Sequence, residues 1–353
     1  MGIKKLNKFL ESHQLINQFN NFTELKKHLK IDRPLLIGID ASLYLYKYSY
    51  SLDNFLKGFI LQITKMLTEK VIPIYIFEGE GIFFKNETIK ARIAKRNKIK
   101  ELINELENNL QTSEDELQRK ELEDLLEKTK KKYIKISPED INNLKKILDY
   151  FNLPYFNAQY EADNLCAFLQ KNNYLDCILS EDMDILVYGC NNQIKIENNQ
   201  IYLYQLPIIL KTLDISYQKF IEMCCLFGSD YIKPIPKLEP EKIYQEIKKT
   251  DIISFINSVN LEHIMPKLKE VVDSEDFNLE YGTKFTRDYQ DYFEIINLYL
   301  NNDNLEKKTF YIPPYNGFNY QKIISFLNNF NIFKDSFEKK KIFFFINKAH
   351  NIY

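Results

Sequence analysis

The sequence lacks a strong excess of charge of either sign. Its 353 residues carry a formal net charge of -1, and 27% of them are charged. This balance does not by itself indicate a nucleic-acid-binding protein, although acids clustered in one region could cancel a basic surface in another. The positions of the charges therefore carry more information than their sum. The hydrophobic content of 45% predicts an ample core, in one large domain or two smaller ones.

Cysteine and histidine are too few and too scattered to indicate a disulfide framework or a zinc site. No C-x-x-C spacing is present, and we expect reduced, mostly buried thiols in an intracellular protein. The residues concerned are Cys166, Cys177, Cys190, Cys224, Cys225, His13, His28, His263 and His350.

Long apolar segments are also missing. The amino-terminal residues do not form the apolar segment of a signal peptide, and no run of about 18 apolar residues could span a membrane. We expect a soluble intracellular protein without a membrane partner, with nucleus and cytoplasm both open as compartments. The absence of tryptophan and the low number of glycines, nine, fit an AT-rich genome such as that of a large DNA virus or a protist.

Three short apolar runs predict buried parallel strands, and helical patterns flank each of them, as in an α/β fold. The runs are residues 35–39, 72–77 and 177–179. Each is followed by acid, in the form of Asp40, Glu78 and the stretch 181–184. Because open α/β sheets place their sites outside the carboxyl ends of the strands, the three runs predict one acidic cleft.

Helical patterns dominate the rest of the chain. A charged segment breaks near residues 111–115 at a capping-box signal that begins with Ser113, which predicts a helical hairpin. A solvated hairpin or a short coiled coil without a function is the alternative interpretation. Ser137 and Pro138 predict the start of another helix, and Asn198-Asn199 predicts the turn of a strand hairpin.

Seven carboxylates could converge on the predicted cleft. Asp182 and Asp184 point the same way after a strand, because side chains at i and i+2 share a face of extended chain. The full set is Asp40, Glu78, Glu161, Asp163, Asp182, Asp184 and Asp230. So many carboxylates cannot all stay ionised without cations, and Mg²⁺ or Mn²⁺ prefers such oxygen ligands. Two ions about 4 Å apart can activate a water and stabilise the leaving oxygen of a phosphodiester. Taken singly, each acid is more simply a solvated charge.

Five short motifs follow one another in the order found in the flap endonuclease family, the structure-specific 5′ nucleases of the XPG type, and the sequence resembles this family. The motifs are Met1-Gly2-Ile3, Ile39-Asp40-Ala41-Ser42, Tyr160-Glu161-Ala162-Asp163, Ser180-Glu181-Asp182-Met183-Asp184 and Gly228-Ser229-Asp230-Tyr231. The resemblance covers roughly residues 1–105 and 135–250.

The resemblance implies that the seven carboxylates bind two Mg²⁺ ions, with Mn²⁺ as a substitute. It implies that Lys85 and Arg92 reach the scissile phosphate as catalytic residues, and that Gly2 approaches the DNA. Tyr46 matches an aromatic residue that stacks on a terminal base, although packing is the simpler role for it among the alternating tyrosines 44–50. Residues 85–100 hold seven basic side chains against one acid, Lys95 and Arg96 among them, as expected for contact with a phosphate backbone. The family's helical arch lies at this position.

The sequence departs from the family in three places. Glu78 stands where the family has aspartate, which lengthens the side chain by about 1.5 Å, one carbon–carbon bond. Residues 235–240 replace a glycine-rich hairpin, so that Lys237 would have to contact phosphate with its side chain. Residues 321–327 have the glutamine of a sliding-clamp peptide without its aromatic pair, and a core helix is the better interpretation.

The sequence therefore predicts an α/β fold with a mostly parallel central sheet flanked by helices, a helical arch insertion and a helix-hairpin-helix-like DNA-binding region. Five regions are expected: 1–84 and 136–210 of the nuclease, an arch at 85–135, a duplex-binding region at 211–275, and an aromatic-rich region at 276–353 that packs on the nuclease core. The expected protein is a monomer that cuts 5′ flaps and branched ends of DNA in replication, repair or recombination. A catalytically weak DNA-binding or recruitment protein and a ribonuclease of a related fold are the alternatives.

Overall fold

The computed structural model describes residues 2–3, 5–52, 54–79, 86–113, 115–232, 234, 238–252, 289–300, 309–329, 333 and 335–353.

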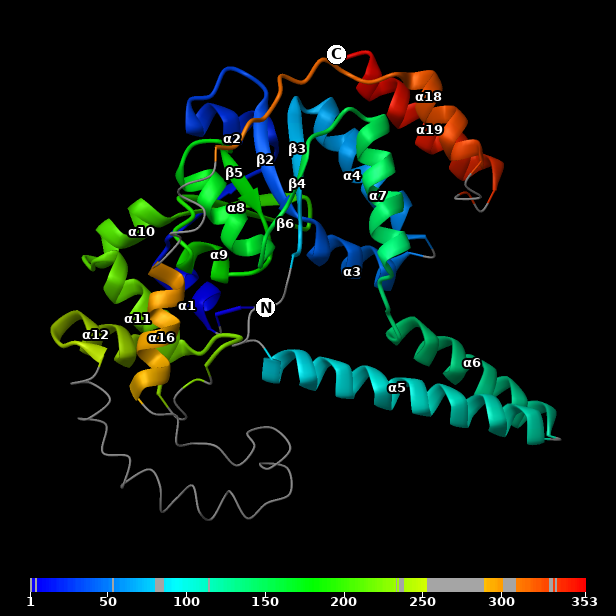
Figure 1. The fold of residues 1–353 in the computed structure, drawn as a ribbon, viewed down its shortest axis with the longest axis horizontal. Coiled ribbons are helices and arrows are strands. Elements are labelled where there is room, and N and C mark those ends of the chain that lie inside the picture. Colours follow the sequence, from blue (N-terminus) through cyan, green and yellow to red (C-terminus); the bar gives the residue numbers. More distant parts are fainter. Residues whose placement is uncertain are drawn as a thin grey trace.

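A seven-stranded sheet lies at the centre of this part of the chain, in the order β1-β7-β6-β5-β2-β3-β4 (Figure 1). The strands are β1 (Ile16–Phe19), β2 (Leu35–Asp40), β3 (Val71–Phe77), β4 (Tyr155–Asn157), β5 (Cys177–Leu179), β6 (Asn192–Glu197) and β7 (Gln200–Gln205). Strands β4, β3, β2, β5 and β6 run parallel, and β7 pairs antiparallel with both β6 and β1. The prediction of a mostly parallel sheet is thus confirmed, as are its three predicted strands.

The central strands are buried on both faces, which explains why they appear in the sequence as continuous apolar runs. Successive side chains alternate between two cores: Ile37, Ile39 and Tyr75 contribute to one, whereas Ile74 and Ile76 contribute to the other. Helices cover each core, which gives a three-layer α/β/α arrangement.

On one face pack the helices α1 (Leu6–Ser12), α8 (Ala162–Lys171), α9 (Asp184–Val187), α10 (Leu206–Leu213), α11 (Tyr217–Phe227), α12 (Pro240–Lys249) and α16 (Tyr289–Leu300). On the other pack α2 (Phe22–Leu29), α3 (Ala41–Ser51), α4 (Phe55–Thr68), α7 (Pro138–Tyr150), α18 (Tyr320–Asn329) and α19 (Ser336–His350). The helix α7 begins at the expected N-cap Ser137, which forms a capping box with Asp140, and the β6–β7 hairpin turns at Asn198 and Asn199, both with positive φ.

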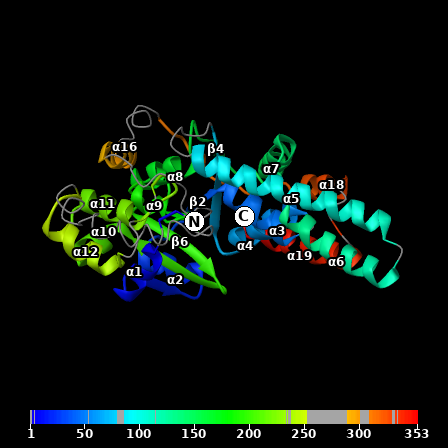
Figure 2. The same ribbon diagram turned by 90° about the horizontal axis from the view of Figure 1, so that it is seen from below.

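The helices α5 (Asn86–Thr112) and α6 (Glu116–Lys132) form the predicted hairpin, which projects from the body of the molecule (Figures 1 and 2). A small apolar core of Ile103, Leu106 and Leu126 joins the two helices. The break falls where the sequence predicted it, but the predicted cap is wrong. The N-cap is Asp115, two residues after Ser113, because α6 begins only at residue 116. The carboxylate of Asp115 accepts the backbone N–H of Leu117.

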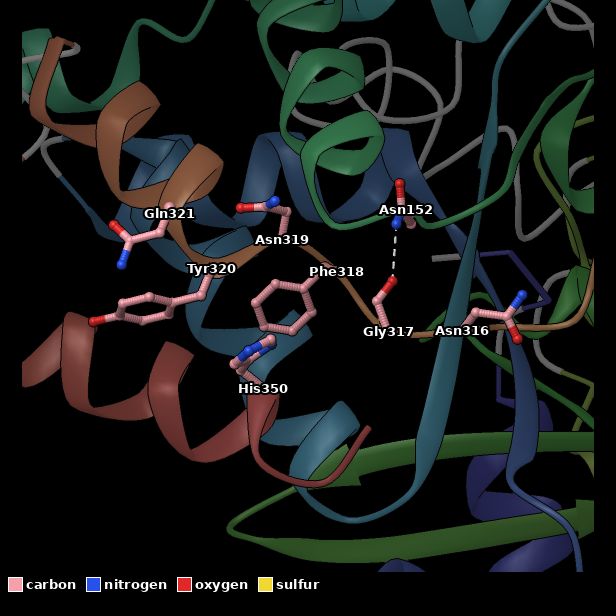
Figure 3. Close-up of a pocket in the computed structure, with 8 residues that line it drawn as sticks. All are labelled: Asn152, Asn316, Gly317, Phe318, Asn319, Tyr320, Gln321 and His350. Atoms are coloured by element: carbon pink, nitrogen blue, oxygen red, sulfur yellow. Dashed lines mark hydrogen bonds between the residues drawn. The ribbon is translucent and has the colours of Figure 1, made fainter.

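The C-terminal helices α18 and α19 pack on α7 and α4, and the extended segment 309–319 leads into them. Figure 3 shows a shallow pocket of about 480 Å³ where it crosses the end of α7. There the side-chain amide of Asn152 donates to the carbonyl of Gly317 at 2.9 Å, and the ring of Phe318 packs between those of Phe151 and His350. The division of the chain into five functional regions stays a prediction.

Two smaller expectations concern burial. All five cysteines are buried and unpaired, as predicted. In the clamp-like segment, Ile323 and Leu327 are buried inside α18, which confirms the core-helix interpretation. No helix of the described residues combines the length and the apolar character needed to cross a bilayer.

Candidate functional site

The carboxyl ends of β2, β3 and β5 meet at one edge of the sheet. In the register of the sheet, Asp40 pairs with Ile76 of β3, and Ile39 pairs with Leu179 of β5. Glu78 follows β3 directly, and the loop that carries Asp182 follows β5. We call this place the acidic edge and define it by six residues: Asp40, Glu78, Glu161, Asp163, Asp182 and Asp184.

Asp40 lies at the centre of the acidic edge. Its carboxylate caps α3 by accepting the backbone N–H of Ser42 at 2.8 Å, and its side chain is buried. Burial raises the pKa of Asp40 from 3.8 to about 7, and the negative charges of Glu78 and then Asp182 add to this rise. Glu78 and Asp182 are therefore each close enough to Asp40 to repel its carboxylate.

This repulsion predicts a stability gain for Asp40→Asn in the metal-free protein. A carboxyl group whose pKa is raised on folding stabilises the fold fully below pH 3.8, and that contribution is lost as the pH rises through about 7. At pH 8 in EDTA, we expect the variant to be more stable by about 2 to 4 kcal/mol, at 1.36 kcal/mol per pKa unit. Urea unfolding between pH 4 and 8 measures this. An Asp214→Asn variant, whose carboxylate is exposed, serves as control, and parallel pH profiles for all three proteins would contradict the assignment.

Hydrogen bonds fix the loop after β5 in the shape that presents two acids. The backbone N–H of Asp182 donates to Ser180 Oγ at 3.0 Å, and that of Asp184 donates to Asp182 Oδ1 at 3.0 Å. The buried amide of Gln193 on β6 donates to the carbonyls of Ser180 and Asp182, at 3.0 and 2.7 Å. Asp184 then opens α9 and is itself buried.

Gly2 lies against this pair of acids. Its φ is +74°, and a Cβ atom on it would stand 1.8 Å from Asp182 Oδ1 and 2.9 Å from Asp184 Oδ1. No side chain fits at such distances, and the left-handed backbone also favours glycine. The amino-terminal segment therefore reaches the acidic edge through bare backbone.

Glu78 connects the acidic edge to α8. Its Oε2 accepts the backbone N–H of Ala162 at 3.0 Å, at the start of the helix where donors lack helical partners. Glu161 occupies the N-cap position of α8, but its own side chain makes no capping bond. Glu78, directly after β3, thus caps the helix that begins at Glu161 and carries Asp163.

The remaining acids face the same place. Glu161 is 3% exposed and Asp163 is 8% exposed. Burial raises the pKa of the Cys166 thiol on α8, and the negative charges of Asp40, Asp163 and Glu78 raise it further. The thiol therefore lies close enough to Asp40, Asp163 and Glu78 to feel the charge of all three. Asp230 is half-buried in the loop after α11 and is not part of the acidic edge as we define it.

The donor set fits a hard divalent cation, because every group is a carboxylate and the pKa of Asp40 is raised by burial and by its like-charged neighbours. Within the described residues, no three His, Cys, Asp or Glu side chains are drawn together into a ready-made metal shell. Mg²⁺ does not require one, since it usually keeps several waters and takes one or two carboxylates.

Among the predicted DNA-contacting residues that the structure describes, Gly2 lies at the acidic edge, Tyr46 on α3, and Lys95 and Arg96 on the hairpin. Tyr46 on α3 is 50% exposed, so packing does not explain it, while the neighbouring Lys47 pairs with Glu181 beside Asp182. Lys95 is exposed and Arg96 half-buried on α5. Of the other predicted residues, Lys85 and Lys237 lie outside the described residues, and of Arg92 the structure describes only its position in α5.

Sequence reasoning missed the groups that hold the acids in place. Gln193, Tyr188 and the hydroxyl of Tyr231 all bond to acidic-edge residues or to their loop. The sequence contains one signal for Tyr188, since this residue follows Asp184 by four positions and so shares its helix face.

The fold is that of the Rad2-type nucleases. It matches the catalytic core of Rad2 in complex with a DNA substrate with a TM-score of 0.68 and 18% identity, over 98% of this chain and 100% of that one. The chain belongs to the XPG family of structure-specific nucleases: the XPG N-terminal domain matches residues 1–99, and the XPG I-region matches residues 152–230.

Relatives with longer alignments agree. Flap endonuclease 1 of Trypanosoma brucei gambiense is 26% identical over 281 residues, 72% of this chain and 69% of that protein. A probable RAD2-like endonuclease of Invertebrate iridescent virus 6 is 28% identical over 304 residues, 70% of this chain and 71% of that protein. The XPG family consists of metal-dependent, structure-specific nucleases.

Proposed function

We propose that this protein is a divalent-metal-dependent, structure-specific 5′ nuclease that hydrolyses DNA at 5′ flaps and branched ends. The observation that carries the proposal is the acidic edge itself, where Glu78 and Asp182 repel the buried carboxylate of Asp40 and the bare backbone of Gly2 lies against Asp182 and Asp184. A buried carboxylate next to two further acids does not stabilise a fold, and carboxylates with a raised pKa in such surroundings cluster at functional sites.

The acidic edge would hold Mg²⁺, with Asp40, Glu78, Glu161, Asp163, Asp182 and Asp184 as ligands directly or through water, and Asp230 as a further ligand from the loop after α11. Bound divalent cations supply Lewis-acid stabilisation of the phosphate and a water of lowered pKa. The protein itself contributes position: the hydrogen-bonded loop of Asp182 and the cap that Glu78 gives to α8 hold the carboxylates before substrate arrives. Lys85 and Arg92 would add positive charge at the scissile phosphate.

The hairpin of α5 and α6 would act as the arch that contacts the single strand, and Tyr46 as a platform for the terminal base. An exposed aromatic ring beside a buried acidic site has little use in packing, whereas base stacking on such a ring contributes about 1–3 kcal/mol per base.

Basic residues of α5 should make the binding of flap DNA dependent on salt. The double substitution Lys95→Ala/Arg96→Ala removes up to two phosphate contacts, so the slope of log K against log salt should flatten by about one to two. The cleavage rate at saturating enzyme should stay unchanged. Titrations from 50 to 200 mM salt, with Arg119→Ala/Lys120→Ala near the far end of the hairpin as a matched control, measure this. Identical slopes for all three proteins would remove the arch from the proposal.

A panel of labelled substrates tests the function as a whole. It contains 5′ flap, nicked, gapped and four-way junction DNA, each incubated with Mg²⁺, with Mn²⁺ and with EDTA. We expect metal-dependent cutting near the base of the 5′ flap and little cutting of the intact junction. Cutting that persists in EDTA, or that ignores the branch, contradicts the proposal.

The same panel separates two alternatives. A recruitment protein of this fold would bind the branched DNA in Ca²⁺ and leave every member of the panel intact in Mg²⁺. The departures of the sequence that favour this alternative are Glu78 in place of the family's aspartate and the segment 235–240 in place of its glycine-rich hairpin. A ribonuclease would cut RNA versions of the panel faster than the DNA versions.

A further inference from the structure

Three buried tyrosines lie behind Glu161. Tyr188 follows α9, Tyr231 stands in the loop after α11, and Tyr299 comes from α16; all three are at most 2% exposed. The hydroxyl of Tyr188 donates to Glu161 Oε2 at 2.9 Å, and the hydroxyl of Tyr231 donates to the same oxygen. The two hydroxyl oxygens are 2.6 Å apart. We call these residues the tyrosine cluster.

The hydrogen bonds of the cluster can be counted. The hydroxyls of Tyr188 and Tyr231 supply two protons for three oxygen–oxygen contacts, two with Glu161 Oε2 and one between the hydroxyls. Either both hydroxyls donate to Glu161, or one hydroxyl donates to the other and the second donates to Glu161, because a carboxylate can only accept. In every arrangement at least one hydroxyl therefore donates a hydrogen bond to Oε2 of Glu161, and the cluster can hold this carboxylate in one orientation.

The rings of the cluster are fixed by packing. The ring of Tyr299 lies 4.8 Å from that of Tyr188 and 5.6 Å from that of Tyr231, measured between centroids, in tilted and edge-on geometry. The helix α16 packs on α11 (Figure 1), so residues remote in sequence brace the two hydroxyl-bearing rings. The side chain of Glu161 accepts from these hydroxyls and does not cap α8, whose first backbone N–H donates to Glu78 instead.

We propose that Tyr188 and Tyr231 are positioning residues, which hold Oε2 of Glu161 and so orient this carboxylate for a divalent cation at the acidic edge. The inference rests on the proposed metal-binding role of Glu161. Groups that hold a metal ligand from behind typically change metal affinity or activity by about 10- to 100-fold when they are removed. The cluster also links the metal site to the loop of the duplex-binding region, since Tyr231 is next to Asp230.

The test is Mn²⁺ binding to the full chain without DNA, followed by electron paramagnetic resonance of the free ion. Tyr188→Phe and Tyr231→Phe keep the rings and remove only the hydroxyls. We expect each to weaken Mn²⁺ binding by about tenfold or more. In single-turnover cleavage, the Mg²⁺ concentration for half-maximal rate should rise in parallel, while DNA affinity in Ca²⁺ stays within about twofold.

Tyr244→Phe is the matched control. Its hydroxyl is buried and donates to the carbonyl of Leu213 at 2.8 Å, away from the acidic edge. This variant should lose a similar amount of thermal stability and bind Mn²⁺ like the wild type. If Tyr188→Phe and Tyr231→Phe are folded and bind Mn²⁺ like Tyr244→Phe, the positioning role is wrong.

The binding assay also separates this inference from the proposed function. A wild-type protein that binds Mn²⁺ and cuts no DNA contradicts the proposed function alone, because the comparison of the tyrosine variants still decides the positioning role. A wild-type protein that binds no Mn²⁺ contradicts both.

Discussion

Replacing Asp182 or Asp184 with alanine is expected to lower the single-turnover cleavage rate by about 1,000-fold or more, because either change removes a carboxylate that would bind the catalytic cations. Binding of flap DNA should survive or tighten, since a negative charge near the phosphates is lost. Quenched-flow cleavage in Mg²⁺ and fluorescence anisotropy in Ca²⁺ measure the two effects separately.

The fold of these variants needs its own check, because Asp182 Oδ1 accepts the backbone N–H of Asp184. Asp182→Asn retains this acceptor and removes only the charge, so it should be as inactive as the alanine variant and closer to wild type in stability. Asp214→Ala, which removes an exposed carboxylate from an ion pair with Lys248, should leave both rate and binding unchanged. Parallel loss of binding and cleavage in the Asp182 variants would mean that the residue is structural.

A methyl group on residue 2 is expected to reduce cleavage by about 100-fold. In Gly2→Ala the new Cβ would fall 1.8 Å from Asp182 Oδ1, so the backbone or the carboxylate must move by an ångström or more. A displacement of about 1 Å at a catalytic centre can cost about two orders of magnitude in rate. Because the substitution removes no charge, the loss should appear in the rate of the chemical step more than in DNA affinity.

Gly317→Ala separates this crowding from simple backbone strain. Gly317 also has a positive φ, +78°, but the Cβ would meet only Tyr353, at 3.2 Å. Left-handed backbone costs an alanine roughly 1–2 kcal/mol at either position. We therefore expect both variants to lose stability and only Gly2→Ala to lose activity. Equal rates for the two variants would show that Gly2 has no part in the reaction.

The sequence was informative where a single element carries its own signal. The strands Leu35–Asp40 and Val71–Phe77 are buried on both faces, so their apolar runs and the acids behind them predicted both the sheet and its acidic end. By contrast, β1 and β4 have four and three residues and mostly half-buried side chains. They become strands because β7 and β3 offer them hydrogen-bonding edges, which no local pattern reveals.

The site shows the same division. Asp40, Glu78 and Asp182 do gather, because parallel strands bring their carboxyl ends together whatever the intervening chain does. The bond from Glu78 to Ala162 could not be predicted, since it depends on one methylene and on the place where α8 starts. The tyrosine cluster was also missed, because Tyr188 and Tyr299 stand in apolar helical surroundings and there predict only core. The roles of the seven acids in binding metal stay predictions.

The position of α18 and α19 has a consequence for biosynthesis. These helices are made last, yet Ile342, Ile346 and Ala349 cover α4, which is made among the first elements. At translation speeds of about 5–20 residues per second, the nascent chain must wait on the order of ten to fifty seconds before this apolar face can be closed. During that interval α4 and the sheet behind it present a surface for chaperones or for aggregation. Slower translation, for example through rare codons, should therefore reduce the yield of soluble protein, even though the amino-acid sequence stays the same.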